Sequence, residues 1–490
     1  MRPFVCTFGL LLAASVAGAQ AGPAPSGRCA LDLSFDRPGT AIKLPSGQRN
    51  IFVGGNVVAR CPAQRLVLKS DSLEYYGDEG RAFFIGNVDY TEPRLTLRSD
   101  FLTYFQREDR LLAIVNVDAT LPSGSNLKGP SLEAWREIPK VRQQHATAIG
   151  RPTINIVEKD SLGRAQPPVT VTGNNIWMMG DSTVASQGDV VVIRPELTAS
   201  GDSLYLEGGT GLLRLMRKPR VLGTRGRPFT LVGETIDVLS KERKLDRVLA
   251  KSKAEAVSRD VNLKSDTIDL RIAGDQLQRA MAWGSSRANA VSASQSMVAD
   301  SVDVLMPDQR LEEMHAVGGA VTEGAPDSVK FHTRERDRLT GDTIVARFDT
   351  AASQVRDTTS KPKIRRVVST GNATSLQHLP PRDTTLRVPA IVYVVGKQIT
   401  VSFDSGAVQR VQVKDEDLAA GLYLEPQDTT RRKRPASAAN GQSQATPPGG
   451  ARVLQRVPAP STPPAPAPAA PTPSPTPSAI PSGATPGKAP

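Results

Sequence analysis

The stretch Asn262-Leu-Lys-Ser-Asp-Thr-Ile-Asp-Leu-Arg271, read on through Met281-Ala-Trp-Gly284, contains the unit that decides the fold. An apolar residue precedes a Ser-Asp pair, and Ile268 and Leu270 then alternate with charged residues. A polar turn at Ala273-Gly-Asp275 leads into a second run that ends in small residues and glycine. Because the apolar residues recur with a period of two, the unit predicts a pair of β-strands and not a helix.

The same pattern recurs along most of the chain. Each unit is numbered from the position after its first Gly, Ser or Ala. The units then start at residues 71, 100, 130, 174, 202, 234, 266, 300, 342 and 397. Most steps are about 28 to 34 residues long, and a period of this size is typical of repeat proteins. Aromatic residues make up only 4% of the chain, which is too few for a large spherical core. We therefore expect one elongated, all-β body: a solenoid-like stack of about ten two-strand units.

The N-terminus has the features of a secretory signal peptide. A basic start is followed by the short apolar run Phe4–Ala17, and small residues at 17–21 offer an A-x-A cleavage site. The apolar run is shorter than the roughly 20 residues that a membrane-spanning helix needs. The sequence therefore predicts export, with residues 1–21 removed.

Two cysteines remain after removal of the signal peptide, Cys29 and Cys61. In an oxidising compartment two cysteines most simply form one disulfide. Their spacing is unlike the C-x-x-C of a redox pair. We therefore expect a structural disulfide near the start of the β body.

The formal net charge of +12 is unevenly distributed. Residues 430–490 carry seven basic residues and no acidic residue, and Arg2 belongs to the signal peptide, which leaves the repeat body at about +4. A sequence pI of about 9.7 is compatible with nucleic-acid binding, but the export signal argues against that partner. Anionic envelope polymers, or anionic lipid and lipopolysaccharide headgroups, fit an exported chain better.

Composition divides the chain into segments. After the signal peptide we expect a polar N-terminal segment at 22–50, β repeats at 51–166 with an insertion near 136–166, and further repeats at 167–425. Residues 426–490 are rich in Pro and Ala and have no hydrophobic period, so a disordered basic tail is predicted. The tail is either a solvated spacer or, through its basic tetrad at 431–434, a peripheral contact with an anionic membrane.

In every unit the residues two and four positions after the start share one face of a sheet, because successive side chains of a strand alternate sides. Trp177, Tyr205 and Val345 occupy the opposite face in three units, where the others carry polar residues. We interpret the Asp at the start of most units as a structural cap of a bend and not as a metal ligand.

The apolar face either lines an open groove or fills a closed core. Its candidate groove residues are Leu73, Tyr75, Leu102, Tyr104, Ile176, Met178, Leu204, Leu206, Ile236, Val238, Ile268, Leu270, Val302, Val304, Ile344, Ile399 and Val401.

Two stretches carry a resemblance to a known family. Val67-Leu-Lys-Ser-Asp-Ser-Leu-Glu-Tyr-Tyr76, read on to Val88, and Leu311-Glu-Glu-Met-His-Ala-Val-Gly-Gly-Ala-Val321 resemble the organic-solvent-tolerance (OstA) family of periplasmic lipopolysaccharide-transport proteins. That family includes LptA, LptC and the N-terminal domain of LptD. The resemblance covers roughly residues 50–410 and implies a V-shaped β-jellyroll whose apolar interior carries acyl chains. The chain departs from the family in having more units than a single bridge subunit.

The resemblance implies a periplasmic lipid-transport bridge, associated with the outer membrane. Its implied partners are lipopolysaccharide or another anionic amphiphile, and other bridge components or an outer-membrane barrel. The alternative is a structural or adhesive β-solenoid with a closed core and no lipid cargo. A polysaccharide-active β-helix enzyme is a third, disfavoured interpretation.

The sequence contains no catalytic motif that would predict an enzyme. The four histidines form no H-E-x-x-H motif and have no metal-site spacing, and the chain contains no G-x-S-x-G elbow. The sequence predicts no cofactor, no metal and no catalytic residue.

Overall fold

The fold is described from a computed structural model. It covers residues 32–426 except 139, 158–163, 165–166, 181, 243, 327–331, 350–361, 384–385, 405 and 415–418. Within these residues the protein is built of 28 strands that form one continuous sheet, with two short 3-10 helices and no α-helix. The prediction of an all-β repetitive fold is confirmed.

The N-terminal half of the body contains β1 to β14. Their bounds are β1 Asp32–Ser34, β2 Thr40–Lys43, β3 Arg49–Cys61, η1 Pro62–Gln64, β4 Leu66–Tyr76, β5 Arg81–Glu92, β6 Leu95–Phe105, β7 Arg110–Thr120, β8 Asn126–Trp135, β9 His145–Ile149, β10 Thr153–Ile156, β11 Val169–Thr172, β12 Asn175–Met179, β13 Thr183–Ile193 and β14 Leu197–Glu207. The region 136–166, predicted as an insertion, contains the short strands β9 and β10. The N-terminal segment contributes β1 and β2, which both pair with β3.

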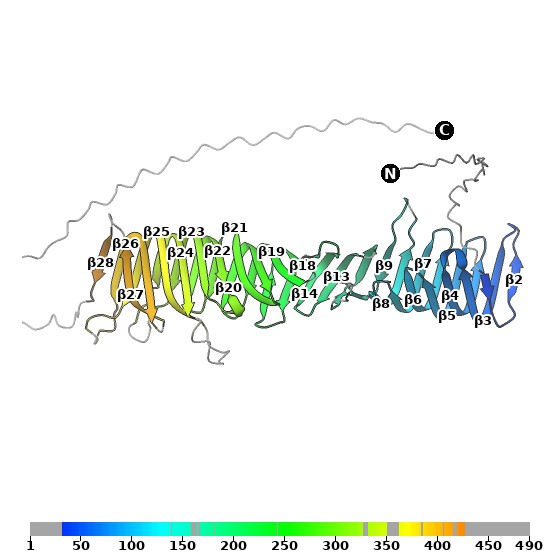
Figure 1. The fold of residues 1–490 in the computed structure, drawn as a ribbon, viewed down its shortest axis with the longest axis horizontal. Helices are drawn as coiled ribbons and strands as arrows, with labels where there is room; N and C mark the ends of the chain where they lie inside the picture. Colours follow the sequence, from blue (N-terminus) through cyan, green and yellow to red (C-terminus); the bar gives the residue numbers. More distant parts are fainter. Residues whose placement is uncertain are drawn as a thin grey trace, which may run out of the picture. The chain divides into compact units, whose positions relative to one another are not determined.

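The C-terminal half contains β15 to β28, and the strands follow one another along the sheet largely in chain order (Figure 1). Their bounds are β15 Leu212–Met216, β16 Arg220–Gly223, β17 Phe229–Val232, β18 Thr235–Lys241, β19 Lys244–Val257, β20 Val261–Ala273, β21 Gln276–Ser292, β22 Gln295–Leu305, η2 Pro307–Gln309, β23 Glu313–Gly324, β24 Asp337–Asp349, β25 Lys363–Leu379, β26 Ala390–Asp404, β27 Ala407–Lys414 and β28 Ala420–Leu424.

Each long strand is interrupted near its middle by a bulge. Between β4 and β5 the pairing register shifts after Lys69 and resumes at Ser72. On β5 the shift coincides with Gly86 and Asn87, which have φ of 77° and 46°. Glycine is favoured at such positive φ because it has no Cβ, and Asn tolerates it. A bulge bends a strand, so every long strand contributes one half to each of two arms.

We name the halves arm 1 and arm 2. Arm 1 contains the halves at 72–76, 81–85, 101–105 and 110–114 and their counterparts up to β27. Arm 2 contains the halves at 66–70, 88–92, 95–99 and 117–120 and their counterparts up to β28. Their inner faces form one hydrophobic core, which runs from Val53 to Val401.

In two places the bend becomes a complete break. β8, β9, β12, β13, β11 and β10 pair in a closed ring of six strands, because two successive strands are split into separate halves. β14, β15, β18, β19, β17 and β16 repeat this arrangement. The short strands β9, β12, β15 and β18 belong to arm 1, and β10, β11, β16 and β17 belong to arm 2.

Candidate functional site

The candidate groove residues all lie in arm 1, with their side chains on its inner face. Sixteen of the seventeen are buried, with at most 9% of their surface exposed, and Tyr75 is partly buried against the same core. Leu204, Ile236 and Ile268 lie in one register row on alternate strands. The strands between them complete the row with Leu215 and Ala250. The structure thus brings together residues that the sequence spreads over more than 300 positions.

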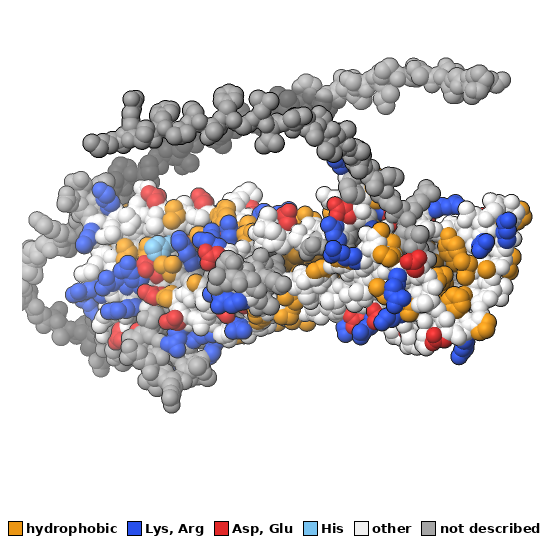
Figure 2. Space-filling model, turned by 45° about the vertical axis from the view of Figure 1, so that its right-hand side comes forward, with side chains coloured by type: hydrophobic (Ala, Val, Ile, Leu, Met, Phe, Trp, Pro, Cys, Tyr) orange, Lys and Arg blue, Asp and Glu red, His pale blue; other side chains and the backbone are white. Residues whose placement is uncertain are grey.

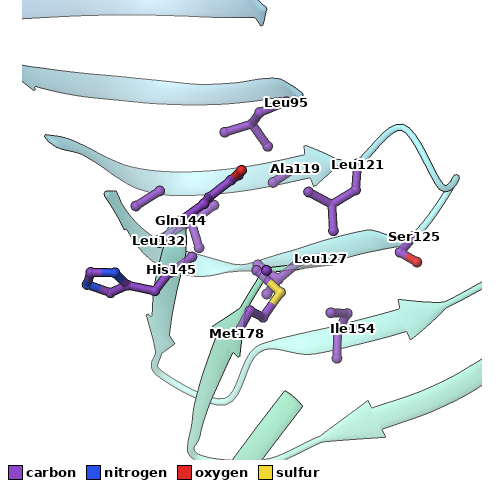
Figure 3. A pocket seen from close by; sticks show the side chains of 13 residues that line it. Leu95, Ala119, Leu121, Ser125, Leu127, Leu132, Gln144, His145, Ile154 and Met178 are labelled. Atoms are coloured by element: carbon purple, nitrogen blue, oxygen red, sulfur yellow. The ribbon is translucent and has the colours of Figure 1, made fainter. Parts of the chain in front are cut away.

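The interior between the arms is filled by side chains. The cavity between β6, β7, β8 and β12 has a volume of only about 30 Å³, and its lining includes Leu95 and Leu127 from arm 2 and Met178 from arm 1. Figure 3 shows the Met178 side chain beside Leu127, with Ile154 close by. A pocket for a drug-sized ligand has roughly 300 to 1,000 Å³, so this part of the interior holds an acyl chain only if the arms move apart.

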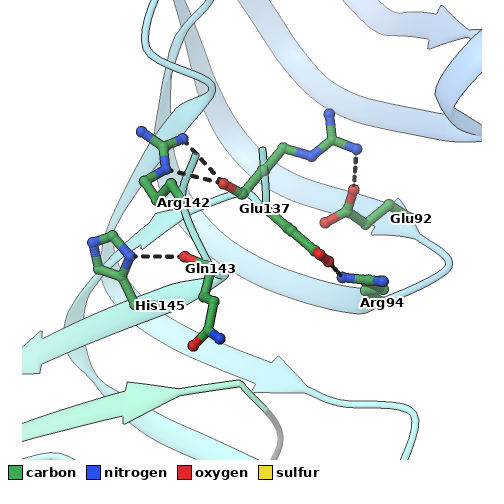
Figure 4. Close-up of polar contacts among 7 residues, drawn as sticks. Glu92, Arg94, Glu137, Arg142, Gln143 and His145 are labelled. Carbon is green, nitrogen blue, oxygen red and sulfur yellow. Dashed lines mark hydrogen bonds and ion pairs between the residues drawn. The ribbon is translucent and has the colours of Figure 1, made fainter. Parts of the chain in front are cut away.

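The strand ends of the two arms meet along a seam that we call the mouth. Next to the small cavity, the mouth is crossed by polar contacts (Figure 4). Arg136, just after β8 on arm 1, donates to Glu92 at the end of β5 on arm 2, with 2.5 Å between Nη2 and Oε2. Arg136 also donates to Gln64, and Arg94 forms an ion pair with Glu137. We call these contacts the N-terminal clasp.

A second set of contacts crosses the mouth in the C-terminal half. Arg225, in the β16–β17 loop of arm 2, lies 3.3 Å from Asp275 in the β20–β21 turn of arm 1. Gln309 of arm 1 donates from Nε2 to the Arg225 carbonyl at 3.3 Å and accepts from the Arg227 backbone N–H. We call these contacts the central clasp. The ion pairs Arg94–Glu137 and Arg225–Asp275 are exposed, and pairs of this kind typically contribute about 0–1 kcal/mol each, so they can be exchanged for water at modest cost. The Arg136–Glu92 pair is largely buried and costs more to break.

Near the C-terminal end the mouth holds a buried polar pair. His378 donates its backbone N–H to Asp337, and its Nδ1 lies 2.8 Å from the same Oδ1. Burial raises the pKa of Asp337 above its ordinary value, although the contacts with His378 oppose this shift. The pair lines a cavity of about 100 Å³ together with Ser294, Ile364 and Phe403 and neighbouring residues.

The aspartates at the bends have the structural role that the sequence predicted. Asp266 accepts hydrogen bonds from the hydroxyls of Ser285 and Ser286 and from the Ser286 backbone N–H on the next strand. These hydrogen bonds hold the pKa of Asp266 well below its ordinary value. Asp71 and Asp100 accept hydrogen bonds from the side-chain amides of Asn87 and Asn116 on the next strand.

Other predicted site features are only partly described. Cys61 is disulfide-bonded, and Cys29 lies outside the described residues, so the pairing of the two stays a prediction. Among the residues with described positions, no cluster of His, Cys, Asp and Glu is arranged to hold a metal ion. No helix in the described part of the chain is long and apolar enough to cross a membrane.

Sequence reasoning missed the residues of the mouth. Arg94, Arg136, Glu137 and Arg225 lie in loops between strands, where no period marks them. Only Arg136 and Glu137 had a sequence signal, because they belong to the basic stretch after Trp135 that interrupts the repeat. Which distant acid each arginine meets depends on how the two arms come together.

No protein-family model matches the chain, and no curated protein matches it either.

Proposed function

We propose that the protein is an exported lipid-binding bridge, which shields the acyl chains of lipopolysaccharide or a related amphiphile between its two arms. The observation that carries the proposal is the single apolar core, which continues through successive strands from Val53 to Val401. A buried row of equivalent apolar positions offers an acyl chain similar surroundings at every step. Such a cargo can slide without any catalytic residue.

The packed interior determines how loading takes place. The arms separate at the mouth, the clasps exchange their partners for water, and acyl chains replace part of the contact between the arms. Each buried methylene contributes about 0.8 kcal/mol, so a chain of about twelve carbons gains roughly 10 kcal/mol before the cost of separating the arms. The resemblance to the OstA family supports a periplasmic location beside the outer membrane, with other bridge components as partners.

The second candidate function is a structural or adhesive β-solenoid. The near-complete burial of Ile236, Ile268 and Ile344 favours it, because side chains packed in this way fill a core. The two functions differ in one property: the bridge must open along the mouth, and the solenoid has no reason to do so.

The deciding experiment is photo-crosslinking of the full chain with lipopolysaccharide. A photoreactive residue at Leu206, Ile236 or Ile268 reports on the interior. Matched controls are Tyr205, Thr235 and Thr267, one position earlier on the same strands and facing outward. The bridge predicts lipid adducts from the three inner positions and few from the outer ones. Correctly folded variants that capture no lipid, or equal capture from both faces, would refute the bridge and leave the solenoid.

The central clasp supplies a second test. Arg225→Ala removes the ion pair with Asp275 and is expected to speed the appearance of adducts at Ile236, because the mouth opens more readily. The control is Arg217→Ala, which removes an exposed ion pair with Asp202 at a bend, away from the mouth. Equal rates in the two variants would show that the clasp does not control loading.

A further inference from the structure

The outer face of arm 1 carries large, exposed apolar side chains, although a sheet face that points to solvent does not need them for folding. Phe101, Trp177 and Trp283 are 43%, 37% and 38% exposed there. Trp135, the remaining tryptophan of the chain, lies on the same face and stacks on His145. All three tryptophans therefore share one of the two outer faces.

Around Phe101 the exposed residues form a connected patch. Ile85, Phe101 and Ile114 are in register on neighbouring strands β5, β6 and β7, and Phe101 and Ile114 are both exposed. With Tyr76 and Phe83 they line an open cleft of about 420 Å³ on this face. Hydrophobic side chains gather at the right-hand end of the view in Figure 2, where the N-terminal strands lie. Contiguous exposed apolar surface of this kind marks an interaction site.

Towards the C-terminal end the same face becomes cationic. One register row near the strand ends runs across nine consecutive strands, β19 to β27. Its residues, in order, are Arg247, Arg271, Arg279, Leu305, Glu313, Arg347, Arg366, Ser402 and Arg410. Neighbouring strands are about 4.8 Å apart, so six guanidinium groups lie along a line of roughly 40 Å.

The carboxylates beside this row neutralise only part of its charge. Asp269 accepts from Arg247 at 2.7 Å and from Arg271 at 3.1 Å, so one carboxylate serves two arginines. Asp303 pairs with Arg279, and Glu313 pairs with Arg347, whose side chain is still 58% exposed. Arg366 and Arg410 are exposed at the end of the row. Lys and Arg side chains gather over this end of the body in Figure 2.

We propose that the outer face of arm 1 is a docking surface for an anionic lipid bilayer. Arginine attracts anionic headgroups, and Trp and Phe favour the boundary between headgroups and acyl chains. The outer face of arm 2 offers a contrast, because its exposed apolar residues among those described are aliphatic or tyrosine: Ile193, Leu222, Val257, Val291, Tyr393, Leu422 and Leu424. A surface that combines tryptophan with an arginine row suits a bilayer better than a soluble anion. The proposal concerns the outside of the sheet and does not depend on cargo in the interior.

Intrinsic tryptophan fluorescence tests the proposal directly, because every tryptophan lies on the docking face. The full chain is mixed with vesicles of phosphatidylcholine alone, or of phosphatidylcholine with phosphatidylglycerol. We expect co-sedimentation and a blue shift of the emission only with the anionic vesicles, and quenching by brominated acyl chains. Because exposed charges are screened by salt, binding is expected to weaken as ionic strength rises.

Paired variants locate the surface. Arg366→Glu with Arg410→Glu reverses two charges of the row and is expected to weaken vesicle binding by at least about tenfold. The matched control is Arg98→Glu with Lys128→Glu, two exposed basic residues on the outer face of arm 2, and it should bind normally. A Trp177→Ser and Trp283→Ser variant should also bind more weakly, which a purely electrostatic contact would not show.

Several outcomes would overturn the proposal. These are absence of binding to anionic vesicles, equal loss in the control pair, or sedimentation without any change in tryptophan emission. Competition by soluble polyphosphate that leaves the emission unshifted would assign the arginines to a soluble polyanion. None of these results affects crosslinking from Ile236 or Ile268, so failure here is distinguishable from failure of the bridge.

Discussion

A single residue at the bend of β7 departs from the pattern of its neighbours. Four other bends place glycine first and Asn or Asp second, as at Gly86-Asn87, and both residues have positive φ. β7 has Val115 in the first position, at φ 65°. A β-branched side chain in this region is strained, by about 1–2 kcal/mol for an ordinary L-residue. Arg217-Lys218 and Ser252-Lys253 also place non-glycine residues at positive φ, but Val115 is the β-branched residue in such a pair. The fold therefore tolerates a locally unfavourable residue at this bend.

Replacing Val115 by glycine should stabilise the protein. Relief of the strain exceeds the loss of backbone entropy that glycine brings, and the expected gain is about 0.5–1 kcal/mol in the free energy of unfolding. Urea unfolding of the two proteins measures it. Val117→Gly serves as the control, because Val117 is buried and its truncation should destabilise. A lower midpoint for Val115→Gly would show that the bend does not strain the valine.

Because of Tyr104, the free energy of unfolding is expected to fall at alkaline pH. Burial raises the pKa of Tyr104 to about 12, and Asp109 adds to the effect. Since the folded pKa lies above the unfolded value of about 10, the stabilisation is complete below pH 10 and is lost as pH rises towards 12. The rise of this pKa from about 10 to about 12 corresponds to roughly 3 kcal/mol in the free energy of unfolding.

Ultraviolet absorbance of tyrosinate, followed during an alkaline titration, tests this prediction. Tyr104→Phe should remove one tyrosine that ionises well above pH 10. The free energy of unfolding of the variant should then decrease less steeply above pH 10. Burial also raises the pKa of Tyr90 well above its ordinary value, so at least this late-titrating tyrosine should remain in the variant. Titration of every tyrosine near pH 10 in the folded protein would contradict the buried position of Tyr104.

At the scale of the strand, the bend is held by an acid on one strand and donors on the next. Asp266 and the Ser285–Ser286 pair illustrate it: the hydrogen bonds that Asp266 accepts favour its ionised form and so lower its pKa. A folded pKa below the unfolded value of about 3.9 stabilises the fold above that pH, and the stabilisation is lost as pH falls through the folded pKa.

Asp266→Asn should therefore lower the urea midpoint at neutral pH and change it less and less as the pH falls below about 4. Parallel unfolding curves of the native protein and the variant at several pH values measure the difference. The control is Asp32→Asn, which removes an exposed carboxylate on β1, outside the bends and the clasps. A difference that does not change with pH would mean that the amide, and not the lost charge, is responsible.

The strand pattern was predictable because it depends on local chemistry. Ile268 and Leu270 face inward as their period of two required, and the Asp at the bend caps the next strand as expected. The arms were not predictable in the same way. Whether the inward residues line a groove or fill a core depends on how far apart the two arms stand, and no spacing between residues encodes that distance. Arg94 and Glu137 are 43 positions apart and meet only because both arms end at the mouth.

At the scale of the whole molecule, each strand of the stack is stabilised mainly by the strands next to it. Each strand pairs mainly with its two neighbours, so the free energy of unfolding is close to a sum over neighbouring strands, as in other repeat proteins. The two six-strand rings interrupt this regularity, because their short strands such as β10 and β11 pair over only three or four residues on each side.

A charge placed in the core of β20 should therefore unfold its neighbourhood and spare distant strands. Ile268→Asp buries an unpaired carboxylate at a fully buried position, a change that destabilises by several kcal/mol. Amide hydrogen exchange should speed up in β18 to β22 and stay slow in β4 to β6, on the far side of both rings. Thr267→Asp, facing outward on the same strand, is the control and should leave exchange nearly unchanged. Uniformly faster exchange from β4 to β26 would instead show that the body unfolds as one cooperative unit, in which case the arms could not open locally to admit a lipid.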